Sequence, residues 1–148
     1  MGFVIGGICL VLFDQITKWI AAQQLQVGHS VPLPGHVVYL TLVHNPGAAF
    51  GILAHATGLL ILLTLAVLAI VWANRRKIGK QPLCFKLGLT LGLSGAIGNL
   101  IDRLRFGYVI DFLDVRIWPV FNVADVGIVA GVALLFWSII RSGQEANI

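Results

Sequence analysis

The sequence contains few charged residues. Asp, Glu, Lys and Arg together make up 11% of its 148 residues, whereas roughly a quarter of the residues of a soluble domain are charged. Hydrophobic residues make up 58% of the chain, and the mean hydropathy is +0.94. This composition excludes an ordinary soluble domain and predicts an integral membrane protein. The length is typical of one domain, so we interpret residues 1–148 as a single membrane domain.

Cysteine is also scarce. The two cysteines, Cys9 and Cys84, lie in or beside apolar segments and form no CxxC pair, so we expect both to be inert, buried thiols. This pattern predicts neither a disulfide framework nor a zinc site. The four histidines all lie within residues 23–56, in no zinc-binding pattern, and neither HExxH nor GxSxG occurs. We therefore expect a site without a metal or another cofactor.

Four apolar segments approach the length that a helix needs to cross a bilayer, which is about 20 residues. They cover approximately residues 2–22, 57–73, 83–104 and 120–140. The second segment is slightly short. The predicted fold class is mainly α, an integral membrane protein built as a bundle of four transmembrane helices.

The distribution of basic residues predicts the orientation of this bundle. Lys and Arg are absent from residues 23–56, whereas five of the ten basic residues lie between Arg75 and Lys86. Cytoplasmic loops are enriched in Lys and Arg. We therefore predict that residues 74–82 and both termini are cytoplasmic, and that residues 23–56 and 105–119 lie on the outer face. The basic cluster is better explained as a topology signal than as a nucleic-acid site.

The outer segment 23–56 also has the features of a small β-sheet. Residues 36–45, "HVVYLTLVHN", are rich in β-branched and aromatic residues, and proline and glycine flank them; this predicts a strand or two. Residues 109–115, "VIDFLDV", are predicted to supply another strand. Because lipid does not tolerate open sheet edges, we expect the sheet to be extracytoplasmic.

Polar residues inside the apolar segments need an explanation, because a charged group at the centre of a bilayer costs about 3 kcal/mol or more. Asp14 and Lys18 are four residues apart in the first segment, so their side chains meet on one helical face. We interpret them as a self-neutralising pair that braces a site. A catalytic lysine is the alternative, although no serine lies in a recognisable partner motif.

The third apolar segment carries a stripe of glycine and polar residues at steps of four, three, four and three. Its members are Gly88, Gly92, Gly95, Asn99 and Asp102. Small residues at this spacing allow two helices to approach closely, so the stripe is predicted to face inward and to carry its two polar residues with it. Arg103 lies one step around the helix. We interpret Asn99, Asp102 and Arg103 as a structural network.

The fourth apolar segment carries a second polar pair near its start, Asn122 and Asp125, predicted to share one helical face. Asp125 is predicted to lie about one and a half turns from the outer end. When two carboxyl groups lie close together in a protein interior, their repulsion separates their two pKa values. One group then stays protonated while the other stays ionised. Aspartic proteases use this state: the ionised carboxylate takes a proton from water, and the protonated carboxyl binds the scissile carbonyl. Asp111 and Asp114 are both candidate partners, on opposite faces of an extended segment, and the pattern does not choose between them.

Two other classes of protein fit a bundle with buried Asp and Asn. One is a small transporter or proton pathway, although the polar residues gather at the predicted outer end and not along the full depth. The other is an assembly factor in which the polar contacts are purely structural.

Five short motifs resemble, in order, those of lipoprotein signal peptidase, the signal peptidase II family of bacterial aspartyl peptidases. They are "FDQITK" (13–18), "HNPGAAFG" (44–51), "GNLIDR" (98–103), "VIDF" (109–112) and "FNVAD" (121–125). The resemblance implies an enzyme of the bacterial inner membrane that removes the signal peptide from diacylglyceryl-modified prolipoproteins, cutting just before the lipidated cysteine. It further implies binding of membrane lipids and of the antibiotic globomycin, and no nucleic acid.

The resemblance also implies which residues form the site. It assigns the catalytic pair to Asp111 and Asp125, and so chooses Asp111 over Asp114. The positions that shape or support the site are Asp14, Lys18, Asn45, Gly47, Asn99, Asp102, Arg103 and Asn122. The small residues after Pro46 are expected to leave space for lipid or for the peptide backbone.

Overall fold

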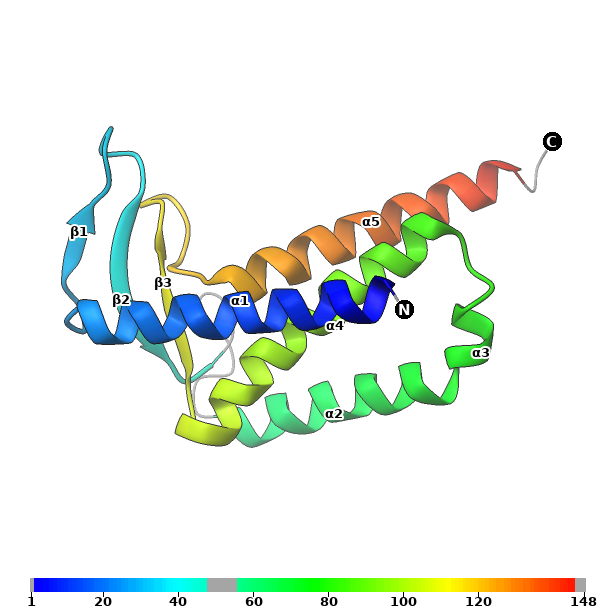
Figure 1. Ribbon diagram of the computed structural model, residues 1–148, viewed down its shortest axis with the longest axis horizontal. Coiled ribbons are helices and arrows are strands. Elements are labelled where there is room, and N and C mark those ends of the chain that lie inside the picture. The colour runs from blue at the N-terminus through cyan, green and yellow to red at the C-terminus, as the bar shows by residue number, and fades with distance from the viewer. Residues whose placement is uncertain (1, 48–55, 146–148) are drawn as a thin grey trace.

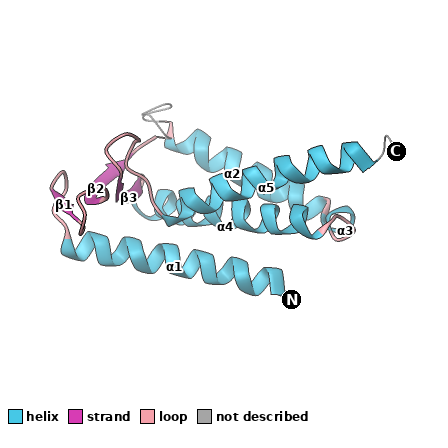
Figure 2. Cartoon of the chain, turned by 90° about the horizontal axis from the view of Figure 1, so that it is seen from above, coloured by secondary structure: helices cyan, strands magenta, loops and turns pink. Residues whose placement is uncertain are grey.

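The computed structural model describes residues 2–47 and 56–145, apart from the side chains of the last three of these residues. Its elements in chain order are α1 (Gly2–Gln24), β1 (Ser30–Pro32), β2 (Tyr39–Asn45), α2 (Thr57–Ala73), α3 (Arg75–Ile78), α4 (Leu83–Phe106), β3 (Val109–Asp114) and α5 (Val123–Glu145). The sheet lies at one end of the long helices (Figure 1). The start of α1, the end of α5 and the connection through α3 lie at the other end (Figures 1 and 2).

Three of the helices are long and apolar enough to cross a membrane: α1, α4, and α5 over Val123–Ser142. The fourth predicted segment forms α2, which is apolar but has 17 residues. The mainly helical class is therefore confirmed, with three membrane-span candidates among the residues that the structure describes. The predicted fourth segment starts too early, because residues 120–122 precede α5.

Glycines allow α4 and α5 to pack closely. A Cβ atom added at Gly95 would overlap the carbonyl oxygen of Ala124, and one at Gly88 would lie 2.8 Å from the carbonyl oxygen of Gly131. Only the absence of a side chain permits such backbone contact. At Gly88 and Gly95 the predicted stripe therefore faces α5, whereas a Cβ atom added at Gly92 would meet nothing within 4 Å. Close packing at Gly95 brings the two helices together next to Asn99.

The sheet is antiparallel with the order β1-β2-β3. The predictions of strands within residues 36–45 and 109–115 are confirmed by β2 and β3. Gly107 ends α4 in the left-handed conformation, with φ of 79°, which glycine adopts without steric cost. The chain can therefore turn directly from α4 into β3, which leads Asp111 back over the end of the helix pair.

The interior of the bundle is polar and its outer surface is apolar. The largest almost completely buried side chains among the described residues are Lys18, Asn122, Asp14, Asp102 and Asp111. Large apolar side chains such as Trp19, Leu62 and Val129 are more than 60% exposed. A soluble protein has the reverse arrangement, whereas lipid accepts an apolar surface and drives polar groups inward.

The prediction that both cysteines are buried is wrong. Cys9 is exposed and Cys84 is only partly buried. Glycine contacts and the polar cluster occupy much of the interior of this small bundle, so many apolar side chains are left on its surface.

Candidate active site

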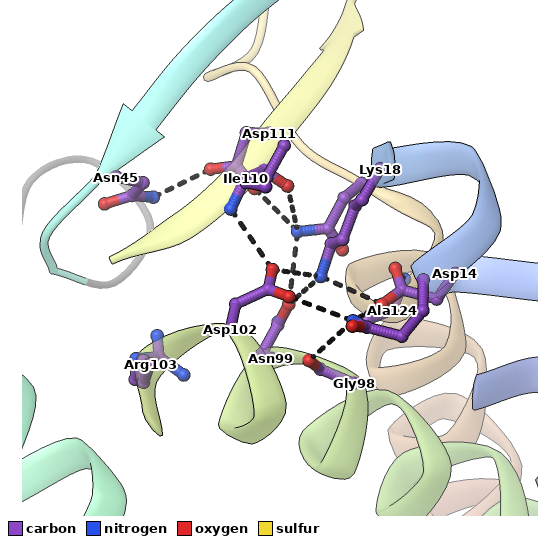
Figure 3. Close-up of polar contacts among 12 residues, drawn as sticks. Asp14, Lys18, Asn45, Gly98, Asn99, Asp102, Arg103, Ile110, Asp111 and Ala124 are labelled. Carbon is purple, nitrogen blue, oxygen red and sulfur yellow. Dashed lines mark hydrogen bonds and ion pairs between the residues drawn. The ribbon is translucent and has the colours of Figure 1, made fainter. Parts of the chain in front are cut away.

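Lys18 lies at the centre of a buried network that joins α1 to α4 (Figure 3). Its Nζ atom is 2.9 Å from Oδ2 of Asp14 and 2.8 Å from Oδ2 of Asp102, and it donates a 2.9 Å hydrogen bond to Oδ1 of Asn99. The predicted Asp14–Lys18 pair is confirmed, but Lys18 is shared with a second carboxylate. Because Lys18, Asp14 and Asp102 are each 1% exposed, these contacts replace the hydration that the charges lose.

Gln15 belongs to the same network, and sequence reasoning missed it. Its Nε2 group donates to Oδ1 of Asp102 at 2.9 Å and to Oδ2 of Asp14 at 3.2 Å. A further bond of 3.2 Å reaches the carbonyl oxygen of Gly98. The available signal was its place inside "FDQITK", between the two residues of the predicted ion pair.

Two asparagines connect this network to the carboxyl groups of Asp111 and Asp125. Asn99 donates from Nδ2 to Oδ1 of Asp125 at 2.7 Å. Asn122, which is 0% exposed, donates from Nδ2 to Oδ1 of Asp111 at 2.6 Å and to Oδ1 of Asn99 at 3.2 Å. The other carboxyl oxygen of Asp111 accepts from Nδ2 of Asn45 at 2.9 Å. One continuous set of hydrogen bonds thus links α1, α4, β2, β3 and α5.

The prediction that Asn122 and Asp125 share one face of a helix is wrong, because Asn122 lies just before α5 whereas Asp125 lies in its first turn. Oδ1 of Asn122 accepts from the backbone N–H of Asp125 at 2.9 Å, and the backbone N–H of Asn122 donates to Oδ2 of Asp125 at 3.2 Å. This reciprocal pattern is a capping box. Asp125 therefore lies in the first turn, where a carboxylate is stabilised by the helix dipole.

Asp111 and Asp114 point in different directions from β3. Asp111 contacts Asn45 and Asn122, whereas Oδ2 of Asp114 accepts from the hydroxyl of Thr41 at 2.7 Å. Strand geometry sends residues three apart to opposite faces. The structure therefore brings Asp111, and not Asp114, towards Asp125.

Asp111 and Asp125 both line a cavity of about 200 Å³. Asn45, Asn99 and Arg103 also line it, which places a cation and two amides around the two carboxyl groups. Asp111 is 2% exposed, so its carboxyl group lies at the inner side of this cavity. Two carboxyls, amide donors and room for a few waters are the components of acid–base hydrolysis.

Arg103 was predicted to form a structural network with Asn99 and Asp102, but its hydrogen bond goes to a different segment of the chain. Its Nη2 group donates to the carbonyl oxygen of Gly47 at 3.0 Å, while Asp102 on the same helix pairs with Lys18. Adjacent helical residues point about 100° apart, which separates the two side chains. Arg103 thus holds the last described residue of the 23–47 segment beside the cavity. Residues 48–55, with the predicted small residues after Gly47, lie outside the described residues.

The electrostatic environments of the two aspartates on β3 differ. Burial, together with the negative charge of Asp125, raises the pKa of Asp111 to about 7 in spite of the hydrogen bonds from Asn45 and Asn122. Burial would also raise the pKa of Asp114, but hydrogen bonds from Thr41 and from the backbone N–H of Arg116 lower it below its usual value. At neutral pH Asp111 therefore retains a proton in a large fraction of molecules, whereas Asp114 is ionised.

The substitution Asp114→Asn is expected to lower stability without removing activity. The loss of a charge-assisted bond to Thr41 should cost about 1 kcal/mol of unfolding free energy at pH 7. Because the pKa of Asp114 is lowered on folding, this contribution is present above pH ~4 and is lost as the pH falls through the folded pKa. Thermal unfolding in detergent at pH 7 and pH 3 measures it. An equal difference from the wild type at both pH values would contradict this account.

No three His, Cys, Asp or Glu side chains in residues 2–47 and 56–145 are grouped as metal ligands. The acids of the buried network, Asp14, Asp102, Asp111 and Asp125, contact Lys18, amide groups and backbone N–H groups. A helical membrane protein with two carboxyl groups on one buried cavity has the form of a membrane-embedded hydrolase.

Comparison with known proteins gives the family. The model described as Signal peptidase (SPase) II matches residues 7–141. The lipoprotein signal peptidase of Moorella thermoacetica is 46% identical, with 98% of this chain and 97% of that protein covered. That of Pelotomaculum thermopropionicum is 43% identical, with coverage of 93% and 91%. The chain belongs to the signal peptidase II family.

Solved structures show that the fold is shared as well. A structure titled as a bacterial membrane enzyme solved by the in meso method superposes with a TM-score of 0.91 at 30% identity, over 97% of this chain and 90% of that chain. A second structure of the same description gives a TM-score of 0.86 at 31% identity, with coverage of 95% and 93%. These similarities support a multi-pass membrane protein.

Proposed function

We propose that this protein is an intramembrane aspartic endopeptidase that removes the signal peptide from diacylglyceryl-modified prolipoproteins and cuts just before the lipidated cysteine. The observation that carries the proposal is the cavity shared by Asp111 and Asp125 in a chain of the signal peptidase II family. Membership of a peptidase family sets aside the transporter and assembly-factor alternatives.

Each of the two carboxyl groups has one role in this reaction. The ionised Asp125 removes a proton from a water molecule in the cavity, and the water oxygen forms a bond to the scissile carbonyl carbon. The protonated Asp111 donates its proton to the carbonyl oxygen. When the tetrahedral intermediate collapses, the C–N bond breaks, Asp125 passes its proton to the leaving amine, and Asp111 recovers a proton from the intermediate. The raised pKa of Asp111 supports its assignment as the acid.

The remaining polar contacts around the cavity support this pair. Asn45, Asn99 and Asn122 hold the carboxyl groups in place by hydrogen bonds, and Arg103 holds Gly47 at the rim of the cavity. Asp14, Lys18 and Asp102 brace the helices beneath them. No metal or other cofactor takes part in the proposed reaction.

The membrane location follows from the substrate. A lipid-modified signal peptide presents its scissile bond at the outer leaflet, so we place the sheet end of the bundle on the outer face of the bacterial cytoplasmic membrane. The basic connection around α3, including Arg75, Arg76 and Lys77, lies at the opposite end (Figure 1), as the positive-inside rule requires. Both termini are then cytoplasmic. With 17 residues, α2 spans about 26 Å and serves as the fourth crossing helix.

The surface next to Asp125 suits an apolar substrate. A groove of about 440 Å³ runs along α5 from Asp125 past Val126, Val129 and Ala133. Its outer end is lined by Trp118 and Phe121. Membrane lipid and the apolar part of a lipopeptide fit such a surface, and globomycin is proposed to bind at the same cavity.

A gel-shift assay tests the proposed function. Purified protein in detergent is given a diacylglyceryl-modified prolipoprotein, with EDTA and globomycin as separate additions and an unlipidated precursor as the matched control. We expect cleavage of the lipidated precursor alone, unchanged by EDTA and stopped by globomycin. Loss of cleavage with EDTA would indicate a metal mechanism and would overturn the proposal.

The rate of cleavage is expected to depend on pH through Asp111. Because its pKa is raised to about 7, kcat should fall as the pH rises through 7 and Asp111 loses the proton that it donates. The free energy of unfolding should also fall between pH ~4 and 7, since the unfolded chain has already released this proton. Single-turnover rates from pH 5 to 9 measure the first effect. A rate that increases steadily up to pH 9 would contradict the assignment.

A further inference from the structure

Asn99 holds a position in which the orientation of its carboxamide group matters. Its side chain lies between Lys18 on one side and Asp125 on the other, with its oxygen towards Lys18 and its NH2 group towards Asp125. A carboxamide offers an acceptor at one end and donors at the other, so a half-turn would exchange them. In the exchanged orientation an amide oxygen would face the Asp125 carboxylate and repel it.

Lys18 determines which orientation is stable. An ammonium group only donates hydrogen bonds, so the atom of Asn99 that faces Nζ at 2.9 Å must be the oxygen. Asn122 donates to the same oxygen, but at 3.2 Å, and its two N–H bonds are shared among three acceptors: Asn99, Asp111 and the carbonyl oxygen of Ile110. The charge-assisted bond from Lys18 is the stronger of the two.

Two carboxylates pair with Lys18, although its charge still acts on Asp111. They belong to Asp14 and Asp102, and all three side chains are almost completely buried. Within the described part of the chain, the hydrogen bonds and ion pairs of Lys18 go to Asp14, Asp102 and Asn99, and none goes to Asp125. The effect of Lys18 on Asp125 therefore passes mainly through the orientation of Asn99.

We propose that Lys18 is a positioning residue that fixes the Asn99 carboxamide so that its NH2 group donates to Asp125 and keeps Asp125 as the ionised, water-activating carboxylate of the pair. This inference rests on the proposed function. Arg103 from α4 and Asp111 from β3 line the same cavity as Asp125. Asp14 and Lys18 from α1 and Asp102 from α4 are the charged groups linked to it through Ala124 and Asn99. A hydrogen bond donated to a carboxylate stabilises its negative charge, so the loss of this bond removes a stabilising donor from the group that takes the proton from water.

The test compares two variants that differ only in Lys18. Asp14→Asn is the reference, because it keeps the Lys18 donor. Asp14→Asn with Lys18→Met removes a negative and a positive charge together, and so avoids leaving both partner carboxylates without their cation. Relative to the reference, the double variant should lower kcat about 10- to 100-fold with little change in KM. The acid limb of its kcat profile should move up by about one pH unit.

Two further variants separate positioning from a merely structural role. The first comparison is made in proteins that already carry both Asn99→Ala and Asp14→Asn. Adding Lys18→Met to them should change kcat less than twofold, because the side chain through which Lys18 acts is gone. Lys18→Arg, which keeps a group that only donates, should retain the acid limb of the wild type even where melting temperatures fall. If the variant with Lys18→Met does not fold, the acid limb of the kcat profile of Lys18→Arg is measured instead.

The outcomes are distinct. Cleavage by the wild type and not by Asp111→Asn would support the proposed function. The inference about Lys18 is then wrong if the loss of Lys18 leaves the acid limb of the kcat profile in place. It is also wrong if that loss lowers kcat equally with and without Asn99. An acid limb shifted equally by Lys18→Arg and by the Met variant would also overturn it. If the wild type itself does not cleave the lipidated precursor, the proposed function fails instead.

Discussion

Replacing Asp111 with Asn is expected to lower kcat for cleavage of the lipidated precursor about 10²- to 10⁴-fold, the range that general acid–base groups contribute. Asn matches the shape of Asp and keeps an oxygen that can accept from Asn45 or Asn122, but it carries no proton that it can transfer. The fold should persist, since burial of an ionised Asp111 is unfavourable, as its raised pKa shows. Asp125→Asn should cause a loss of similar size, because it removes the base.

Asp114→Asn is the matched control for this prediction. It makes the same chemical change on the same strand, three residues away, at a side chain that is 6% exposed but bound to Thr41 and turned from the cavity. Its kcat should stay within about threefold of the wild type, in line with a local loss of stability. Quantitative gel shifts of all three variants, with unfolding temperatures measured in parallel, check the result. Substantial cleavage by folded Asp111→Asn would overturn the assignment of Asp111.

Replacing Gly95 with Ala is expected to impair both stability and catalysis. A Cβ atom at this position would overlap the carbonyl oxygen of Ala124, which precedes Asp125, and would lie 2.8 Å from Cγ1 of Ile128. Backbone cannot rotate away as a flexible side chain can, so α4 and α5 must separate. We expect a loss of about 1–3 kcal/mol of unfolding free energy. Separation at this level would also stretch the 2.7 Å bond from Asn99 to Asp125 and lower kcat about tenfold or more.

Gly92→Ala provides the matched control on the same helix. An added Cβ atom at Gly92 has no neighbour within 4 Å, so the substitution should be neutral, or stabilising by up to about 1 kcal/mol through helix propensity. Unfolding followed by tryptophan fluorescence, together with the cleavage assay, distinguishes the two variants. Equal behaviour of Gly95→Ala and Gly92→Ala would show that close packing at Gly95 does not position the site.

The sequence was sufficient to predict the elements that have strong, local causes. Apolar length predicted the long helices, and the spacing of Gly88, Gly95 and Asn99 predicted which face of α4 is buried. The four-residue spacing predicted the Asp14–Lys18 pair, whose side chains meet in the structure. These features depend on helical periodicity, which is readable in one segment at a time.

The features that depended on tertiary contacts were not predictable from pattern. Asn122 was placed inside a helix because the apolar run begins before it, although the Asn-x-x-Asp spacing was available as a sign of a capping box. Spacing alone left Asp111 and Asp114 as alternatives, since only the pairing of β3 with β2 determines which of them faces α5. The sharing of Lys18 between two carboxylates joins residues 84 positions apart and has no local signal.

The central claim of this account is that Asp111 is the protonated member of the pair below about pH 7. Difference infrared spectroscopy of the protonated carboxyl band, recorded for the wild type and for Asp111→Asn between pH 5 and 9, tests it most directly. We predict a band that is present at pH 5, disappears as the pH rises through about 7, and is missing from Asp111→Asn. A band of unchanged intensity in Asp111→Asn, or no protonated carboxyl at pH 5, would contradict the account.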